Sequence, residues 1–288
     1  MARLNKIFTL VILALLLLTA LAHAESPAMH QAIKRLAATK GPFTFAVIGD
    51  SRSGDRVYAK VVKQMMLRNP LFVVNVGDVI VHSGDRKHWQ HFREISKTID
   101  VPYFLTPGNH DIDDENSKQV WLEEVDRPGD NTYYSFTVGK NLFVVLNSFD
   151  PASEFRIINS QLEWLRQTLD SKRYQHQFVF LHHPLFMWKG ATHEGEALDR
   201  YPADRDRLYD LLARNHVDAV FSGHEHTFKR MTRGGIAFII TGGGGQPLYG
   251  RDSFNHGVIV RVDGANIEAK VIDREGLLRD EFMIQPQK

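Results

Sequence analysis

Five short polar clusters combine residue types that bind metal ions, and each cluster directly follows a compact apolar run. They are Gly49-Asp50-Ser51-Arg52, Gly77-Asp78, Gly108-Asn109-His110-Asp111, His182-His183-Pro184 and Gly223-His224-Glu225-His226. Carboxylate and amide oxygens together with imidazole nitrogens form a ligand set that suits Zn, Mn or Fe and suits Ca poorly. The clusters therefore predict a transition-metal site. Because the sequence has no Cys, thiolate ligands, thiol catalysis and disulfides are excluded.

The number of these ligands favours two ions. Two Asp, one Asn and three or four His are more than one tetrahedral ion binds. A carboxylate can bridge two ions about 3.5–4 Å apart, and such a pair clamps the attacking and leaving oxygens of a phosphoryl displacement and generates hydroxide from water. On an extended segment His224 and His226 point the same way, and Glu225 points elsewhere. The predicted chemistry is metal-assisted phosphoryl transfer to water.

The apolar runs before the first three clusters predict parallel strands separated by helices. The runs lie at residues 43–48, 71–76 and 103–106, and helical patterns lie at 57–67 and 88–99. Continuous apolar strands are typical of parallel strands that are buried on both faces. Asp50, Asp78 and Asn109 recur at intervals of 28 and 31 residues, close to the roughly 30 residues of a βαβ unit. Because ligand sites lie at the carboxyl ends of such strands, we expect these residues at one sheet edge.

The second half of the chain is richer in predicted strands. Residues 132–138 and 142–147 predict a hairpin that turns at Gly139-Lys140. A helix follows, opened by a Ser160-x-x-Glu163 capping box. Further strands are predicted at 178–181, 219–222, 237–241, 258–262 and 267–272, with a helix at 204–215. With no internal repeat or low-complexity linker, the pattern indicates one α/β domain.

In their order along the chain, the clusters resemble the motifs of the calcineurin-like metallophosphoesterases. Gly-Asn-His-Asp followed by Gly-His-x-His is a specific signature, and the resemblance covers roughly residues 41–285. The helix at 161–165 also resembles one that the family carries after its central hairpin. The resemblance implies a four-layer α/β/β/α sandwich of two mixed β-sheets flanked by helices. It also implies hydrolysis of a phosphate monoester or diester by a metal-bound hydroxide, with a small phosphorylated molecule as substrate.

The resemblance assigns a role to each cluster by position. Asp50 and His226 would hold the first metal ion, and Asp78 would bridge the two ions. Asn109, His182 and His224 would hold the second ion. His110 would be the general acid for the leaving oxygen or a donor to the phosphoryl group, and the ions would be divalent Mn, Fe or Zn. His183 stays open between support of a ligand and contact with the substrate.

Two positions depart from the family pattern. Most relatives have Asp-x-His in the first motif, and here a Gly-Asp-Ser-Arg motif places Arg52 where that His would be. Guanidinium does not bind metal, so the first site is one ligand short and one or two ions remain possible. Arg52 is instead predicted to contact the substrate phosphate. The second departure is Val81, because phosphoprotein phosphatases of the family have an Asp there that orients the catalytic His.

The segment 184–202 directly follows a ligand and has no clear helix or strand. Loops longer than about 12–15 residues are commonly functional. The segment is therefore predicted to form a wall that selects the substrate, with Trp188, Lys189, His193 and Tyr201 as candidate contacts. The glycine run at 242–245 has two interpretations, close approach to phosphate or a strained turn.

The N-terminus has the pattern of a secretory signal peptide. Arg3 and Lys6 precede an apolar run at 7–21, and Ala22-His23-Ala24 is a small-x-small cleavage site. Cleavage after Ala24 predicts a periplasmic or secreted protein, with residues 25–40 as a lead-in segment before the phosphoesterase domain at 41–285. A retained anchor is the alternative, although the run is short for a bilayer core of about 30 Å. No later segment is long and apolar enough to span a membrane.

Removal of residues 1–24 changes the net charge. The 288-residue chain has 35 Lys+Arg and 34 Asp+Glu, and the signal removes two basic residues and no acidic one. The remaining 264 residues then carry a net charge of −1, so bulk charge indicates no nucleic-acid-binding surface.

Two further function classes remain open. A catalytically weak metal- or phosphate-binding protein of the same fold would explain Arg52 in place of a ligand. The presence of Asn109 and His110 argues against a catalytically weak protein. A periplasmic solute-binding module would require two similar lobes, and no such duplication is visible. The sequence predicts no oligomeric state.

Overall fold

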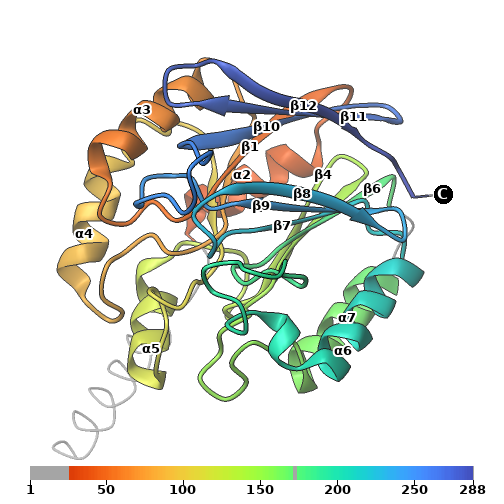
Figure 1. Cartoon of the computed structure of the whole chain (residues 1–288). Helices are drawn as coiled ribbons and strands as arrows, with labels where there is room; N and C mark the ends of the chain where they lie inside the picture. Colours follow the sequence, from red (N-terminus) through yellow and green to blue (C-terminus); the bar gives the residue numbers. More distant parts are fainter. Residues whose placement is uncertain (1–25, 171–173, 288) are drawn as a thin grey trace, which may run out of the picture.

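A computed structural model describes residues 26–170 and 174–287. Two six-stranded β-sheets pack face to face, and helices cover their outer faces (Figure 1). Both sheets contain parallel and antiparallel pairs. The four-layer α/β/β/α sandwich of two mixed sheets is therefore confirmed.

The first sheet joins the parallel strands that carry the early clusters to three antiparallel strands from the C-terminal end. Its strands are β1 (Phe43–Ile48), β2 (Val73–Asn75), β3 (Tyr103–Leu105), β10 (His256–Asp263), β11 (Asn266–Asp273) and β12 (Leu278–Ile284), in the order β12-β11-β10-β1-β2-β3. β1 pairs in parallel with β2 and antiparallel with β10. The first two polar clusters therefore leave neighbouring strands at the same sheet edge. β12 was not predicted, because three consecutive charged residues, 279–281, leave it no continuous apolar run.

The second sheet carries the remaining ligand clusters. Its strands are β4 (Tyr134–Val138), β5 (Asn141–Val145), β6 (His176–Phe180), β7 (Ala219–Ser222), β8 (Phe228–Arg233) and β9 (Ile236–Thr241), in the order β4-β5-β6-β7-β9-β8. β4 and β5 form the predicted hairpin, and Gly139 in its turn has φ +56°. β8 was not predicted, because it is an edge strand whose residues are mostly exposed and three of which are basic.

Helices bury their apolar faces on the outside of both sheets. They are α2 (Pro27–Ala37), α3 (Asp55–Met66), α4 (Arg86–Ile95), α5 (Glu115–Glu124), α6 (Asn159–Asp170) and α7 (Pro202–Arg214). In Figure 1, α3 and α4 lie beside the first sheet, and α6 and α7 lie against the second. α5 was not predicted from apolar spacing. Its start is fixed by Asp114, whose carboxylate accepts the Ser117 backbone N–H while the Ser117 hydroxyl oxygen accepts the Asp114 N–H.

The predicted capping box at Ser160-x-x-Glu163 is wrong. α6 already begins at Asn159, so Ser160 lies inside the helix. The Glu163 carboxylate accepts hydrogen bonds from the Arg166 and Gln167 side chains, one turn further along the helix. Carboxylate pairing at i+3 and i+4 has therefore replaced the reciprocal cap.

Phenylalanines in edge-to-face contact hold the two sheets together. Phe45 of the first sheet lies with its ring centroid 5.2 Å from those of both Phe143 and Phe178 of the second. Phe72, next to β2, lies 5.0 Å from Phe143. All four side chains are fully buried. Rigid rings at these separations set the spacing of the sheets, and with it the spacing of the loops at their edges.

The N-terminal predictions fall partly outside the described residues. The signal peptide at 1–24 and its cleavage after Ala24 lie there. Within the lead-in segment 25–40, α2 packs Met29 and Leu36 into the main core, and the Gly139 N–H donates to the Leu36 carbonyl. Across the described ranges, no helix has the length and apolar character needed to cross a membrane.

Candidate metal centre

The five polar clusters meet where strands of both sheets end. The Asp50 and Asp78 carboxylates and the His182 imidazole offer ligand atoms within 4.8 Å of one another, and so do His182, His183 and His224. His226 Nε2 lies 3.5 Å from Asp50 Oδ1. The ligands expected from both halves of the chain are thus brought to one place.

Asn109 joins the same group of side chains. Its Oδ1 lies 3.1 Å from His183 Nε2, and the next residue, His110, donates its backbone N–H to Asp78 Oδ1 at 3.0 Å. All six residues expected to bind metal therefore lie in one connected cluster.

The backbone at three candidate ligands is in the left-handed region. Asp50 and Asp78 have φ of 58°, and His224 has φ of 71°. Such conformations cost a non-glycine residue free energy and persist where the surroundings enforce them. Here the His224 N–H donates to both Asp50 oxygens, at 3.2 and 3.1 Å. Local backbone strain at these three residues therefore accompanies the orientation of their side chains toward the cluster.

Asp111 has a role that the sequence analysis did not assign. Its carboxylate accepts the backbone N–H groups of Asp78, Val79 and Gly108 at 2.8–3.0 Å, and that of Ile80 at 3.3 Å. Burial and the nearby Asp78 charge raise its pKa to about 7. Asp111 ties the loop after β2 to the loop after β3. The only sequence signal was its place as the last residue of Gly-Asn-His-Asp.

The buried carboxylates of Asp50 and Asp78 lie close together, and a nearby positive charge would stabilise their ionised forms. Burial and the Asp78 charge raise the pKa of Asp50 well above its usual range. Burial also opposes ionisation of Asp78, but its interactions with His182, His110 and Arg52 outweigh the effect of burial and lower the Asp78 pKa. A cation between the two carboxylates would let both ionise.

The imidazoles have the tautomer and the free nitrogen that a metal ion requires. The Nδ1 atoms of His182 and His226 lie 2.8 Å from the Val76 and Pro247 carbonyl oxygens. A carbonyl only accepts, so each Nδ1 carries the hydrogen and each Nε2 carries a lone pair. In the residues that the structure describes, buried His182 Nε2 and His224 Nε2 find no hydrogen-bond partner. Unpartnered lone pairs facing buried carboxylates fit divalent ions.

Burial also keeps these imidazoles in the neutral, metal-binding form. It lowers the pKa of His226 to about 4 and lowers the pKa of His224 well below its usual value. A neutral imidazole presents its lone pair to a cation without first losing a proton. These imidazoles are therefore in the metal-binding form at neutral pH.

Arg52 contacts the carboxylate that is expected to bridge the ions. Its Nε lies 3.1 Å from Asp78 Oδ2, and its side chain is 17% exposed. The guanidinium therefore reaches the cluster from the solvent side, beside the position that lacks a histidine ligand. It partly neutralises Asp78, and one of its N–H groups is used in that contact.

His110 is oriented by a backbone carbonyl. Its Nδ1 lies 3.0 Å from the Val81 oxygen. The Val81 side chain cannot replace the orienting Asp, but the carbonyl of the same residue accepts the Nδ1 hydrogen. The His110 Nε2 is then the atom that can hold or release a proton.

The geometry of His183 favours support of a ligand over contact with substrate. Its ring is fully buried, with Nδ1 3.0 Å from Ser148 Oγ and Nε2 3.1 Å from Asn109 Oδ1. Both ring nitrogens are thus engaged by protein atoms. His183 orients the Asn109 amide.

Of the loop residues at 184–202, the structure brings His193 to the cluster. Its ring centroid lies 4.3 Å from that of His224, and its backbone N–H donates to Glu225 Oε1 at 2.6 Å. Trp188 is half-buried and lines a neighbouring pocket, and Lys189 is exposed. Tyr201 lies elsewhere, with its ring under the Arg156 guanidinium.

The glycine run at 242–245 packs its backbone against the Asp50 loop. The Gly244 N–H donates to the Gly49 carbonyl at 2.8 Å, and a Cβ on Gly244 would lie 2.3 Å from that oxygen. None of the four glycines has positive φ. The strained-turn interpretation is therefore wrong, and close approach to the backbone of the Asp50 loop explains why Gly244 needs to be glycine.

Comparison with known proteins identifies the family. The calcineurin-like phosphoesterase family model matches residues 43–228, more than half of the chain. The chain belongs to the calcineurin-like phosphoesterase family.

Individual relatives agree with that assignment. Serine/threonine-protein phosphatase CPPED1 of Rattus norvegicus is 30% identical over 204 residues, which cover 66% of this chain and 64% of the relative. Purple acid phosphatase 21 of Arabidopsis thaliana is 28% identical over 209 residues, covering 67% of this chain and 46% of the relative. This chain thus spans less than two thirds of the length of these relatives.

A solved structure supports the same fold. Purple acid phosphatase PPD1 from yellow lupin (Lupinus luteus) seeds superposes with a TM-score of 0.72 at 19% identity. The match covers 86% of this chain and 54% of the lupin chain.

Proposed function

We propose that this protein is a metal-dependent phosphoesterase that hydrolyses a phosphate monoester or diester. The observation that carries the proposal is the buried cluster of carboxylates and neutral imidazoles with unpartnered Nε2 atoms beside His110. The names of the relatives, serine/threonine-protein phosphatase and purple acid phosphatase, support a phosphate ester as substrate.

The candidate ligands divide into two groups around Asp78. Asp50 and His226 would hold a first ion and Asn109, His182 and His224 a second, with Asp78 shared. Divalent Mn, Fe or Zn bound here would supply Lewis acidity and an activated water.

Two side chains of the protein would align the ester and donate a proton to it. Arg52 donates to the phosphoryl oxygens and aligns the ester, because its planar fork matches them. His110 donates a proton from Nε2 to the leaving oxygen, while its Nδ1 is held by the Val81 carbonyl.

A hydrolysis panel on the purified protein tests this function. Mono- and bis-p-nitrophenyl phosphate would be assayed after chelation and after resupply of Mn, Zn, Fe or Co, with bound metal measured by mass spectrometry. Activity is expected to disappear on chelation and to return with at least one of these ions. A protein that binds metal and turns over neither ester would instead be the catalytically weak binding protein of the same fold that Arg52 suggests.

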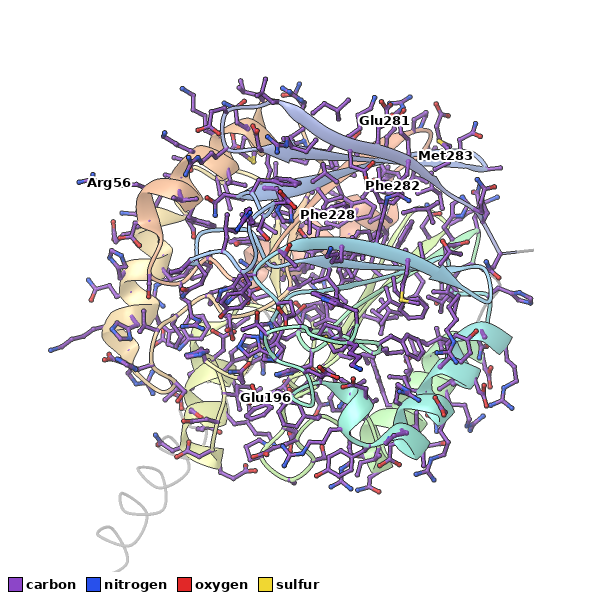
Figure 2. The ribbon with its side chains drawn as sticks, in the orientation of Figure 1. Arg56, Glu196, Phe228, Glu281, Phe282 and Met283 are labelled. Atoms are coloured by element: carbon purple, nitrogen blue, oxygen red, sulfur yellow. The ribbon has the colours of Figure 1, made fainter. Side chains whose placement is uncertain are left out.

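Replacing Arg52 separates substrate contact from metal binding. Arg52→Ala is expected to raise KM roughly tenfold with a smaller change in kcat, because a hydrogen bond to a charged group contributes about 1.5–3 kcal/mol. Arg56→Ala is the matched control, since that arginine of α3 points into solvent (Figure 2). An unchanged KM would exclude phosphate contact. Arg52→His is expected to increase the metal content if the first site lacks a ligand, and an unchanged content would show that it does not.

The proposal also covers the N-terminal segment and the bounds of the phosphoesterase domain. We infer that residues 1–24 direct the chain to the periplasm or outside the cell, and that 41–285 form one phosphoesterase domain. Cell fractionation with N-terminal sequencing of the mature protein tests this. A mature chain that begins at residue 25 is expected, and recovery of an intact chain in the membrane fraction would favour a retained anchor.

A further inference from the structure

An apolar pocket of about 360 Å³ lies on the outer face of the second sheet, under the segment that follows the His182-His183 pair. Phe186, Met187 and Trp188 wall it on the loop side, and Met231, Phe238 and Ile240 on the strand side. Its volume is in the range of small-molecule sites, roughly 300–1,000 Å³. It is not part of the metal cluster.

Strand geometry explains why this surface is apolar. Side chains alternate along β9, so Phe238 and Ile240 face outward while Ile239 joins the inner core. α6 and α7 lie against the same sheet (Figure 1), and the Tyr209 ring of α7 lies 6.3 Å from that of Phe238. The loop covers Phe238 and Ile240 without filling the space above them. Met231, on β8, remains 44% exposed at the edge of the pocket.

The chain ties this pocket to the metal cluster at two points. Pro184 and Ser222 both line the pocket, and each is two residues from a candidate ligand, His182 and His224 respectively. Two residues separate Cα atoms by at most about 7.6 Å. The lining of the pocket therefore begins no more than about 7.6 Å, Cα to Cα, from His182 and His224.

A second, polar pocket adjoins the first on the side of the cluster. It has a volume of about 260 Å³ and shares Trp188 and Lys229 with the apolar pocket. Tyr249 lines it and stacks on the ring of His226 at 4.3 Å between centroids. Lys229 Nζ lies 5.5 Å from the centre of the Trp188 ring, so a cation stands where the two pockets meet.

We propose that the apolar pocket binds an alkyl or aryl group on the alcohol portion of the substrate, so that the substrates are small amphipathic organic phosphates. This inference rests on the proposed function and names its substrate class. The phosphate would lie at the metal cluster and the apolar group against Phe238 and Ile240. Lys229 would face polar or anionic atoms between them. Two methionines in the wall let the pocket adapt to groups of different shape.

Two substrates with the same leaving-group chemistry test the pocket. n-Hexyl phosphate and ethyl phosphate differ only in methylene groups, and burying each extra methylene favours binding by about fourfold. The kcat/KM for hexyl phosphate is expected to exceed that for ethyl phosphate by at least about tenfold. Equal values would overturn the inference.

A pair of methionine variants tests whether the preference for hexyl phosphate arises at this pocket. Met231→Glu places a charge at the edge of the pocket, and the ratio of the two kcat/KM values is expected to fall at least about tenfold. Met283→Glu is the matched control, because Met283 has a similar exposure, 47%, and lies on β12 of the other sheet (Figure 2). The ratio should not change in the control. A ratio that falls equally in both variants, or in neither, would exclude this pocket.

A binding measurement keeps this inference separable from the proposed function. Hexylphosphonate and ethylphosphonate cannot be hydrolysed at the C–P bond, and their affinities would be measured by calorimetry on the metal-loaded protein. Tighter, Met231-dependent binding of hexylphosphonate without hydrolysis of any ester would support the pocket and contradict the enzyme. Hydrolysis of both esters with equal phosphonate affinities would support the enzyme and contradict the pocket.

A phosphopeptide decides between a small molecule and a protein as the source of the apolar group. The comparison substrate is a phosphoserine peptide with leucine beside the phosphoserine. Its kcat/KM is expected to stay below that of hexyl phosphate. If the peptide is the better substrate and loses its advantage in Met231→Glu, the pocket binds a protein side chain and the assignment to small organic phosphates is wrong.

Discussion

Asp78→Asn is expected to lower kcat at least about 100-fold, a loss equivalent to roughly 2.7 kcal/mol of transition-state stabilisation. The Asp78 carboxylate is 2% exposed, and it lies 3.1 Å from Arg52 Nε and 3.3 Å from His182 Nε2. An amide has nearly the same shape but no negative charge, and its NH₂ group would face either the Arg52 Nε–H or the His110 backbone N–H, a donor against a donor. Because Asp78 is the ligand proposed for both ions, bound metal is expected to fall together with turnover.

The control for Asp78→Asn is Asp85→Asn. The partly exposed Asp85 caps α4 by accepting the Lys87 backbone N–H, and Asn caps helices equally well. This variant should keep wild-type activity and metal content. Mass spectrometry of bound metal and steady-state kinetics would be measured on the same preparations. Wild-type rates in Asp78→Asn would contradict the whole metal-based mechanism.

His110→Ala is expected to reduce kcat by a comparable factor, about 100-fold, and to leave metal content unchanged. The imidazole is proposed to donate a proton to the leaving oxygen, and alanine has no group that can do so. The contact that holds Asp78 in place comes from the His110 backbone N–H, 3.0 Å from Asp78 Oδ1, and this contact survives the substitution. Loss of turnover without loss of metal therefore distinguishes proton donation from ligand positioning.

His91→Ala is the matched control for this experiment. His91 is an exposed histidine on α4 whose Nε2 lies 2.8 Å from Asp55 Oδ2, outside the cluster. It should leave kcat and metal content at wild-type values. If His110→Ala loses metal as readily as Asp78→Asn does, the role of His110 is structural and the proposed proton donor is wrong.

Much of the framework could be predicted from the sequence, because its signals are local. β1 and β7 occupy the predicted ranges, since each is a continuous apolar run that ends in glycine-containing polar residues. The ligand types and their order along the chain also follow from the sequence, because metal chemistry restricts which side chains are useful. Elements without such a pattern were missed, as β8 and α5 show. The edge strand is mostly exposed, and the helix is fixed by its cap.

The tertiary structure alone decided which atoms face one another. No sequence pattern could indicate that four backbone N–H groups converge on Asp111, that Val81 orients His110 through its carbonyl, or that His183 holds Asn109. The same is true of Gly244, whose need for glycine comes from the Asp50 loop nearly 200 positions earlier in the chain. The sequence by itself determined the ligand chemistry and the strands that carry it, through residue type and local periodicity. The hydrogen bonds that orient each candidate ligand depend on close packing between segments that are distant in the sequence, and so does the pocket beside the cluster. Only the folded chain defines this packing.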